Sequence, residues 1–131
     1  MSEIVRTIQI IISTIGGYIG LLVGGVDRFM YVLISFVIID YITGIMVSIL
    51  EKRISSDVGF RGIFKKVMIF LMIVIASEID NYLIKGGSMI RSAVIFFYIS
   101  NEGISILENA SKIGLPIPEK LKNILADLNK E

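Results

Sequence analysis

The sequence predicts an all-α integral membrane protein with four transmembrane helices and a short amphipathic helix near the C-terminus. Hydrophobic residues make up 54% of the 131 positions, and the mean hydropathy is +0.80. These apolar residues gather into four long runs, which soluble domains do not show. Short connections separate the first run from the second and the third from the fourth, so we expect two antiparallel hairpins.

The composition excludes several classes of protein. Thirteen Lys and Arg against twelve Asp and Glu give a net charge of +1, without the basic surplus that nucleic-acid binding requires. The chain has no Cys and no His, which removes disulfides, thiolate nucleophiles, His-based triads and the usual zinc ligands. We therefore expect no nucleic-acid partner, no cofactor and no metal site.

The first two runs are the clearest spans. Residues 7–26 are uncharged, and at about 1.5 Å per residue they cross the roughly 30 Å of bilayer hydrocarbon. The alternative of a cleaved signal peptide lacks both a basic cluster before the run and a small-residue cleavage site after it. Residues 29–50 carry one charge, Asp40, near the middle. Both runs predict transmembrane helices.

The third and fourth runs are more polar. Residues 67–84 contain Glu78 and Asp80, and residues 88–107 contain Arg91 near one end, where its long side chain can snorkel to the headgroups. The fourth run is the weakest, and without it the chain would cross the membrane three times. Four spans nevertheless give the more asymmetric distribution of basic loop residues.

Loop charge predicts the orientation, because Lys and Arg are retained on the cytoplasmic side. With four spans, the central loop (residues 51–66) lies on the same side as both termini, and that side holds ten of the thirteen basic residues. Those of the central loop are Lys52, Arg53, Arg61, Lys65 and Lys66. We therefore expect a multi-pass protein of the bacterial cytoplasmic membrane with both termini in the cytoplasm.

The segment after the fourth run predicts a separate tail. Gly114 and Pro118 bracket a break in the helical pattern, and leucine and isoleucine then recur at helical spacing from Leu121 to Leu128. We divide the chain into a transmembrane domain, residues 1–111, and a cytoplasmic amphipathic tail, residues 112–131.

Small residues in the first run suggest helix association. Gly16, Gly20 and Gly24 repeat every four residues, a spacing that allows helix backbones to approach closely in lipid. Association with another copy and packing within one chain both fit this pattern.

Polar residues within the spans must face protein or water, because exposing them to lipid is costly. Asp40, Gly44 and Ser48 form one stripe, and the Asp40 carboxyl is expected to be protonated, paired or beside an aqueous path. Glu78 and Asp80 cannot share a helical face. A second polar stripe, which continues past the end of the fourth run, consists of Asn101, Ser105, Glu108, Asn109 and Lys112, and fits a pore wall, a subunit interface or a surface helix. Glu102, beside it, is a further candidate.

The strongest motif begins at Asn101. Residues 101–109 read N-E-G-I-S-I-L-E-N, and residues 114–118 read G-L-P-I-P. Together with Asp40 and Thr43-Gly44 in the second span, they make the chain from Phe29 onward resemble the phage lysis and clostridial toxin-secretion holin family. The resemblance implies a bilayer protein that assembles into a large homo-oligomer. It would open a passage for an endolysin or a signal-less toxin, which leads to cell lysis or toxin secretion.

Two other functions use the intramembrane acids. A small ion or proton conductor would use Asp40, Glu78 and Asp80 as a relay, and an intramembrane aspartyl protease would pair Asp40 with Asp80. The protease rests on residue type alone, so we expect a holin and not an enzyme. One four-helix chain is too small to enclose a protein-sized channel, and the holin hypothesis therefore requires many copies of the chain.

Overall fold

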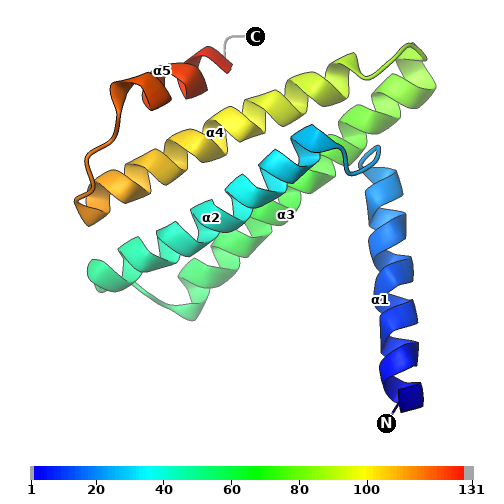
Figure 1. Ribbon diagram of the computed structural model, residues 1–131, viewed down its shortest axis with the longest axis horizontal. Helices are drawn as coiled ribbons and strands as arrows, with labels where there is room; N and C mark the ends of the chain where they lie inside the picture. The colour runs from blue at the N-terminus through cyan, green and yellow to red at the C-terminus, as the bar shows by residue number, and fades with distance from the viewer. Residues whose placement is uncertain (1, 129–131) are drawn as a thin grey trace.

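The computed structural model describes residues 2–128, and within that range it consists of helices joined by short connections (Figure 1). The elements are α1 (Ser2–Leu22), α2 (Arg28–Leu50), α3 (Ser56–Glu78), the π-helical turn η1 (Ile79–Ile84), α4 (Met89–Ile113) and α5 (Glu119–Leu128). Four helices, α1, α2, α3 continued by η1, and α4, are long and apolar enough to cross a membrane. The predicted fold class is thus confirmed.

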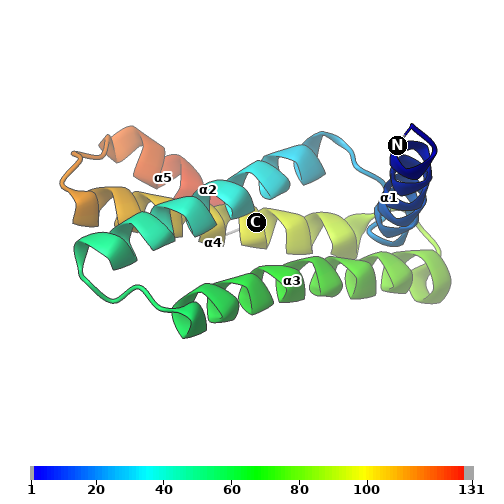
Figure 2. The same cartoon turned by 90° about the horizontal axis from the view of Figure 1, so that it is seen from below.

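Helices α2, α3 and α4 form the body of the molecule (Figures 1 and 2). Helix α4 packs along α2 and also against α3, whereas α2 and α3 make fewer contacts with each other. Met30 and Leu33 of α2, Ile73 of α3 and Ile95 of α4 are buried where these helices meet. Many outward-facing apolar side chains remain exposed, as expected for surfaces that lipid covers.

Helix α1 stands away from this three-helix body (Figure 1). It contacts α3, and none of its described residues is buried. The expected hairpin between the first two runs is therefore wrong. The cause is local: Gly24 and Gly25 have φ angles of +86° and +96°, and they end α1 at Leu22 and redirect the chain. The second expected hairpin, α3 and η1 against α4, is present.

Two helix boundaries differ from the sequence prediction. Helix α3 begins at Ser56 and not at residue 67, because the Ser55 side chain caps it by accepting a hydrogen bond from the Val58 amide at 3.2 Å. Lys65 and Lys66 are consequently helical and not part of a loop. Helix α4 continues beyond residue 107 to Ile113, where Gly114 ends it with φ of +106°.

Helix α5 folds back along α4 (Figure 1). Leu125 is buried against α4, and the Ser100 hydroxyl donates a hydrogen bond of 2.5 Å to the carbonyl oxygen of Leu125. The amphipathic helix predicted after Pro118 is present, and its apolar face has an intramolecular partner.

Candidate intramembrane polar site

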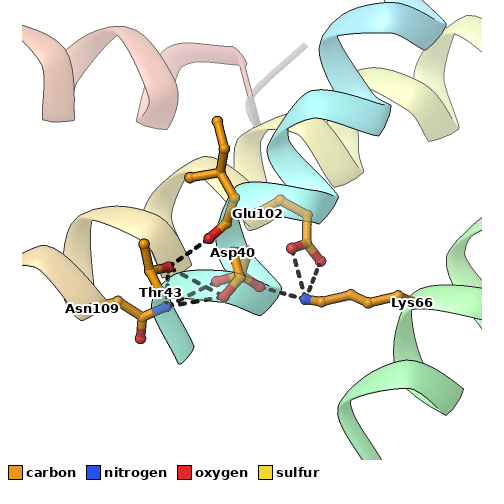
Figure 3. A network of polar contacts seen from close by, with 6 residues as sticks. Asp40, Thr43, Lys66, Glu102 and Asn109 are labelled. Atoms are coloured by element: carbon orange, nitrogen blue, oxygen red, sulfur yellow. Dashed lines mark hydrogen bonds and ion pairs between the residues drawn. The ribbon is translucent and has the colours of Figure 1, made fainter. Parts of the chain in front are cut away.

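One side chain from each helix of the body meets in a charge cluster formed by Asp40, Lys66 and Glu102 (Figure 3). Lys66 Nζ lies 3.0 and 2.7 Å from the two carboxylate oxygens of Glu102, and it also forms an ion pair with Asp40 Oδ2. Both carboxylates are buried. The charge cluster therefore ties α3 to α2 and α4 where direct contact between α2 and α3 is limited.

The second oxygen of Asp40 also has a partner. Asn109 Nδ2, from α4, donates hydrogen bonds to Asp40 Oδ1 at 3.1 Å and to Thr43 Oγ1 at 2.9 Å (Figure 3). The Thr43 hydroxyl in turn donates to the carbonyl oxygen of Ile39 at 2.8 Å. Of the three states considered for Asp40, the geometry matches the paired one.

The charge cluster lies at one level of the helix body. Asp40 is ten residues before the end of α2, Lys66 is ten residues after the start of α3, and Glu102 is eleven residues before the end of α4. Each position is about 15 Å from its helix end, or half the hydrocarbon thickness of about 30 Å. The predicted span 88–107 placed Glu102 near its end, but the longer α4 puts this carboxylate at mid-helix.

Two cavities flank the charge cluster. One holds about 220 Å³ and includes Gly44, Ser48 and Ser105 in its lining, and the other holds about 600 Å³ and includes Lys65, Asn101 and Ser105. The two carboxylates and one ammonium therefore have polar neighbours on both sides. Ser105, which the sequence placed among the pore candidates, lines both cavities.

The two predicted polar stripes have different surroundings. The Asp40, Gly44 and Ser48 stripe faces α4 within the chain, because Asp40 and Ser48 are buried and a Cβ atom at Gly44 would lie 3.9 Å from Asn109 Nδ2. On α4, by contrast, Asn101 and Glu108 are exposed. Asn101 and Glu108 are thus accessible to an external partner, whereas the α2 stripe and Glu102 make contacts inside the chain.

Glu78 and Asp80 do not join the charge cluster. Asp80 caps α4, since its carboxylate accepts hydrogen bonds from the amides of Ile90 at 3.1 Å and Arg91 at 2.8 Å, while Glu78 is exposed. Arg91 and Glu102 are eleven residues apart on α4, which corresponds to about 16 Å. The structure therefore assembles neither the three-acid relay nor the Asp40–Asp80 pair that a protease requires.

Arg91 forms a second polar centre, which we call the α1 anchor. Its guanidinium is buried and donates to the carbonyl oxygens of Val23 at 2.6 Å and Gly25 at 2.8 Å, and to Asp27 Oδ2 at 2.8 Å. Snorkelling of Arg91 to the headgroups, as the sequence suggested, is therefore wrong. The hydrogen bond from Arg91 is the main reason why the pKa of Asp27 is below its ordinary value of 3.8, so Asp27 is ionised at neutral pH.

The basic residues of the predicted central loop separate into two kinds. Arg53 pairs with Glu51, Arg61 lies 3.2 Å from Asp57, and both pairs are exposed, as are Lys52 and Lys65. Lys66 instead points inward to the charge cluster. Sequence reasoning missed this role and those of Asn109 and Arg91. A signal for Lys66 was its helical spacing to Ile69 and Ile73, both buried on α3.

The predicted row of glycines on the first span, Gly16, Gly20 and Gly24, is shorter than the sequence suggested. Gly24 lies beyond α1, and a Cβ atom there would be 2.7 Å from Arg91 Nε, so this glycine serves the α1 anchor. Gly16 has no neighbour within 4 Å of its Cβ position, and Gly20 has only Val26 of the following connection, at 3.6 Å. Within the described residues, no other helix packs against α1 at Gly16 or Gly20.

Comparison with known proteins identifies the family. Residues 17–130 match the Bacteriophage holin family, which covers most of the chain and includes α2, the charge cluster and α5. The chain belongs to the bacteriophage holin family. The match confirms the resemblance seen from Phe29 onward and extends it into α1.

Of three similar proteins, one is named a probable holin. The chain is 34% identical to a probable holin of Bacillus phage phi105, over 72% of this chain and 69% of that protein. It is 39% identical to an uncharacterised 14.9 kDa protein of Clostridium perfringens, over 100% of this chain and 99% of that one. An uncharacterised protein of Listeria monocytogenes is 46% identical over 84% of this chain and 78% of its own length. No solved structure matches the chain.

Proposed function

We propose that the chain is a holin that acts as a homo-oligomer of many copies in the bacterial cytoplasmic membrane, with both termini in the cytoplasm. It opens a passage through which an endolysin or a signal-less toxin leaves the cell, and it is not an enzyme. The observation that carries this proposal is membership of the holin family over residues 17–130, together with four helices able to cross a membrane.

The packing within one chain supports assembly between copies. Leu33, Ile73 and Ile95 fill the space between α2, α3 and α4, and the cavities beside the charge cluster hold about 220 and 600 Å³. Neither cavity can hold a folded hydrolase. A protein-sized passage therefore has to lie between copies, lined by exposed polar residues such as Asn101 and Glu108 of α4.

The charge cluster supports a structural role for the intramembrane acids. A charge in hydrocarbon is tolerated when it is paired and hydrogen-bonded, and Asp40 and Glu102 satisfy this condition through Lys66 and Asn109. A proton relay requires acids that exchange protons along a continuous path. Asp80 binds the start of α4 at Arg91, and Arg91 is about 16 Å from Glu102 of the charge cluster.

The size of the cargo that crosses the membrane distinguishes a holin from an ion conductor, and measuring it tests the proposal. The chain is expressed in bacteria that also produce a folded cytoplasmic reporter enzyme without a signal peptide, and both reporter release and proton flux are recorded. We expect reporter activity in the medium after induction, and none from cells that carry an empty vector. Proton flux without reporter release would contradict the proposal and support the ion-conductor alternative.

A further inference from the structure

Helix α5 is held on α4 by a specific contact. A Cβ atom at Gly103 would lie 2.8 and 2.9 Å from the two methyl carbons of Leu125, so Leu125 occupies a notch that exists because residue 103 is glycine. The hydrogen bond from Ser100 to the Leu125 carbonyl fixes the depth at which α5 docks. A cavity of about 330 Å³ lined by Leu107, Lys122 and others continues the contact between the two helices.

The docked position of α5 conflicts with a lipid-embedded α4. Ser100 is thirteen residues before the end of α4 at Ile113, which places the Leu125 contact about 20 Å into a bilayer core of about 30 Å. Asp127, two residues beyond Leu125, is exposed in this docked helix. Its short side chain cannot reach the headgroups from that depth, and a carboxylate facing lipid is strongly disfavoured. Docking of α5 is therefore costly when lipid surrounds α4, and the contacts of Leu125 with Gly103 and Ser100 are what oppose its release.

The α4 face under α5 suits contact with another helix once α5 has left. Gly103 presents no side chain, Ser100 presents a hydroxyl, and Leu107 follows one turn further on. A glycine and a hydroxyl on one face allow close backbone approach and hydrogen bonding between helices in lipid. The same notch that accepts Leu125 can accept an apolar side chain from a second copy, which brings no charge into the membrane.

We propose that α5 is an autoinhibitory helix that covers the face of α4 through which copies of this chain associate, so that its release precedes assembly. The inference rests on the proposed function in one respect, namely that the chain works as an oligomer. The occupant of the uncovered face is α4 of a second copy, and α5 and that helix compete for the notch at Gly103.

Disulfide cross-linking in the membrane tests the competition, since the chain has no cysteine of its own. A single cysteine replaces Leu107 on the covered face, and dimer yield is measured after mild oxidation. Leu125→Asp, which removes the group that fills the notch, should raise the dimer yield several-fold and bring reporter release forward. Ile124→Ala is the control, because it shortens a side chain that is 50% exposed on the same helix without adding a charge, and it should leave both unchanged.

Two further variants make the result decisive. A chain that ends after Leu115 lacks α5 altogether and should behave like Leu125→Asp, even if the single substitution misfolds. A cysteine at the exposed Phe97 of α4 reports on a face that α5 does not cover, and its cross-linking should not respond to either change in α5. Equal dimer yields at position 107 with and without α5, in a chain that releases the reporter, would overturn the inference and leave the proposed function standing. Absence of cross-links and of reporter release in all variants would contradict both.

Discussion

Lys66 is the residue on which the intramembrane polar site depends. It is the ammonium between two buried carboxylates, and its removal would leave Asp40 and Glu102 unpaired at mid-helix. Breaking a buried ion pair by deleting one partner costs about 3–5 kcal/mol, because the remaining charge is not compensated. The neighbouring Lys65 is exposed and makes no such contact.

We predict that Lys66→Met destabilises the chain by several kcal/mol, whereas Lys65→Met changes its stability little, by about 0.5 kcal/mol or less. Thermal unfolding of the detergent-purified variants, and their amounts in the membrane fraction, measure the difference. Equal unfolding temperatures for the two variants would show that the charge cluster does not hold the three helices together.

Substitutions at Asp40 separate a structural carboxylate from one that lines a water path. Asn retains hydrogen-bonding capacity toward Asn109 and leaves Lys66 and Glu102 as a neutral pair, so Asp40→Asn should assemble and release the reporter almost normally. Asp40→Leu deprives Asn109 of its acceptor and should misassemble, which cross-linking detects. If both variants oligomerise but neither releases protein, the Asp40 charge acts in the passage. Comparing release before and after an uncoupler tests whether that charge senses the membrane potential.

At the scale of the helix, α1 differs from the other spans because no other helix of the described chain packs along its length. Its described residues are all exposed or half-buried, and the Arg91 side chain joins its end to the body. An apolar helix with a small-residue face can associate with a copy of itself without disturbing the rest of the chain. Association and anchoring can therefore be tested separately.

We predict that Gly20→Leu weakens oligomer formation and delays reporter release, because the larger side chain keeps the backbones of two α1 helices apart. The fold of the single chain should survive, since the Cβ position of Gly20 has only Val26 nearby. Tyr18→Leu, on the opposite face of α1 and 62% exposed, is the control. Unchanged oligomers and unchanged timing in Gly20→Leu would place this face against lipid.

We predict that Arg91→Met releases the connection between α1 and α2, because three hydrogen-bond acceptors there lose their donor. A cysteine in place of the buried Ser77 reports this, since Ser77 lies directly under Gly24. Its reaction with a thiol reagent should be several times faster in Arg91→Met than in Arg28→Met, which removes an exposed arginine. Equal reaction rates would mean that α1 is held by other contacts.

At the scale of the whole molecule, the distribution of charge favours one orientation in the membrane. Connections 23–27 and 85–88 lie at one end of the helix body, joined by the α1 anchor, and residues 51–55 lie at the other end (Figures 1 and 2). The exposed basic residues Lys52, Arg53 and Arg61 belong to the second end. This arrangement fits a bundle whose second end faces the cytoplasm.

We predict that both termini are cytoplasmic. Single cysteines at Ser2 and at Asn129, a position outside the described residues, should resist a membrane-impermeant thiol reagent in intact cells and react after the cells are opened. A cysteine in the 85–88 connection, such as Gly86→Cys, is the positive control and should react in intact cells. Labelling of position 129 without position 2 would indicate three spans.

The number of helices and the family could be predicted from the sequence, because each depends on local information. Run length decides whether a helix can cross the bilayer, and glycine or proline after a run decides where it ends. The motif from Asn101 to Pro118 is likewise a property of consecutive residues, and it indicated the holin family that the comparison confirmed.

Only the tertiary structure decided which polar side chains meet. Lys66 was assigned to a loop, although the Ser55 cap starts α3 early and turns this lysine toward α2 and α4. Arg91 was assigned to the headgroups, yet backbone carbonyls 66 and 68 residues away in the chain hold it. The physical reason is that a charge within a membrane protein seeks whatever opposite charge or acceptor the packing brings near, and such partners come from helices distant in sequence.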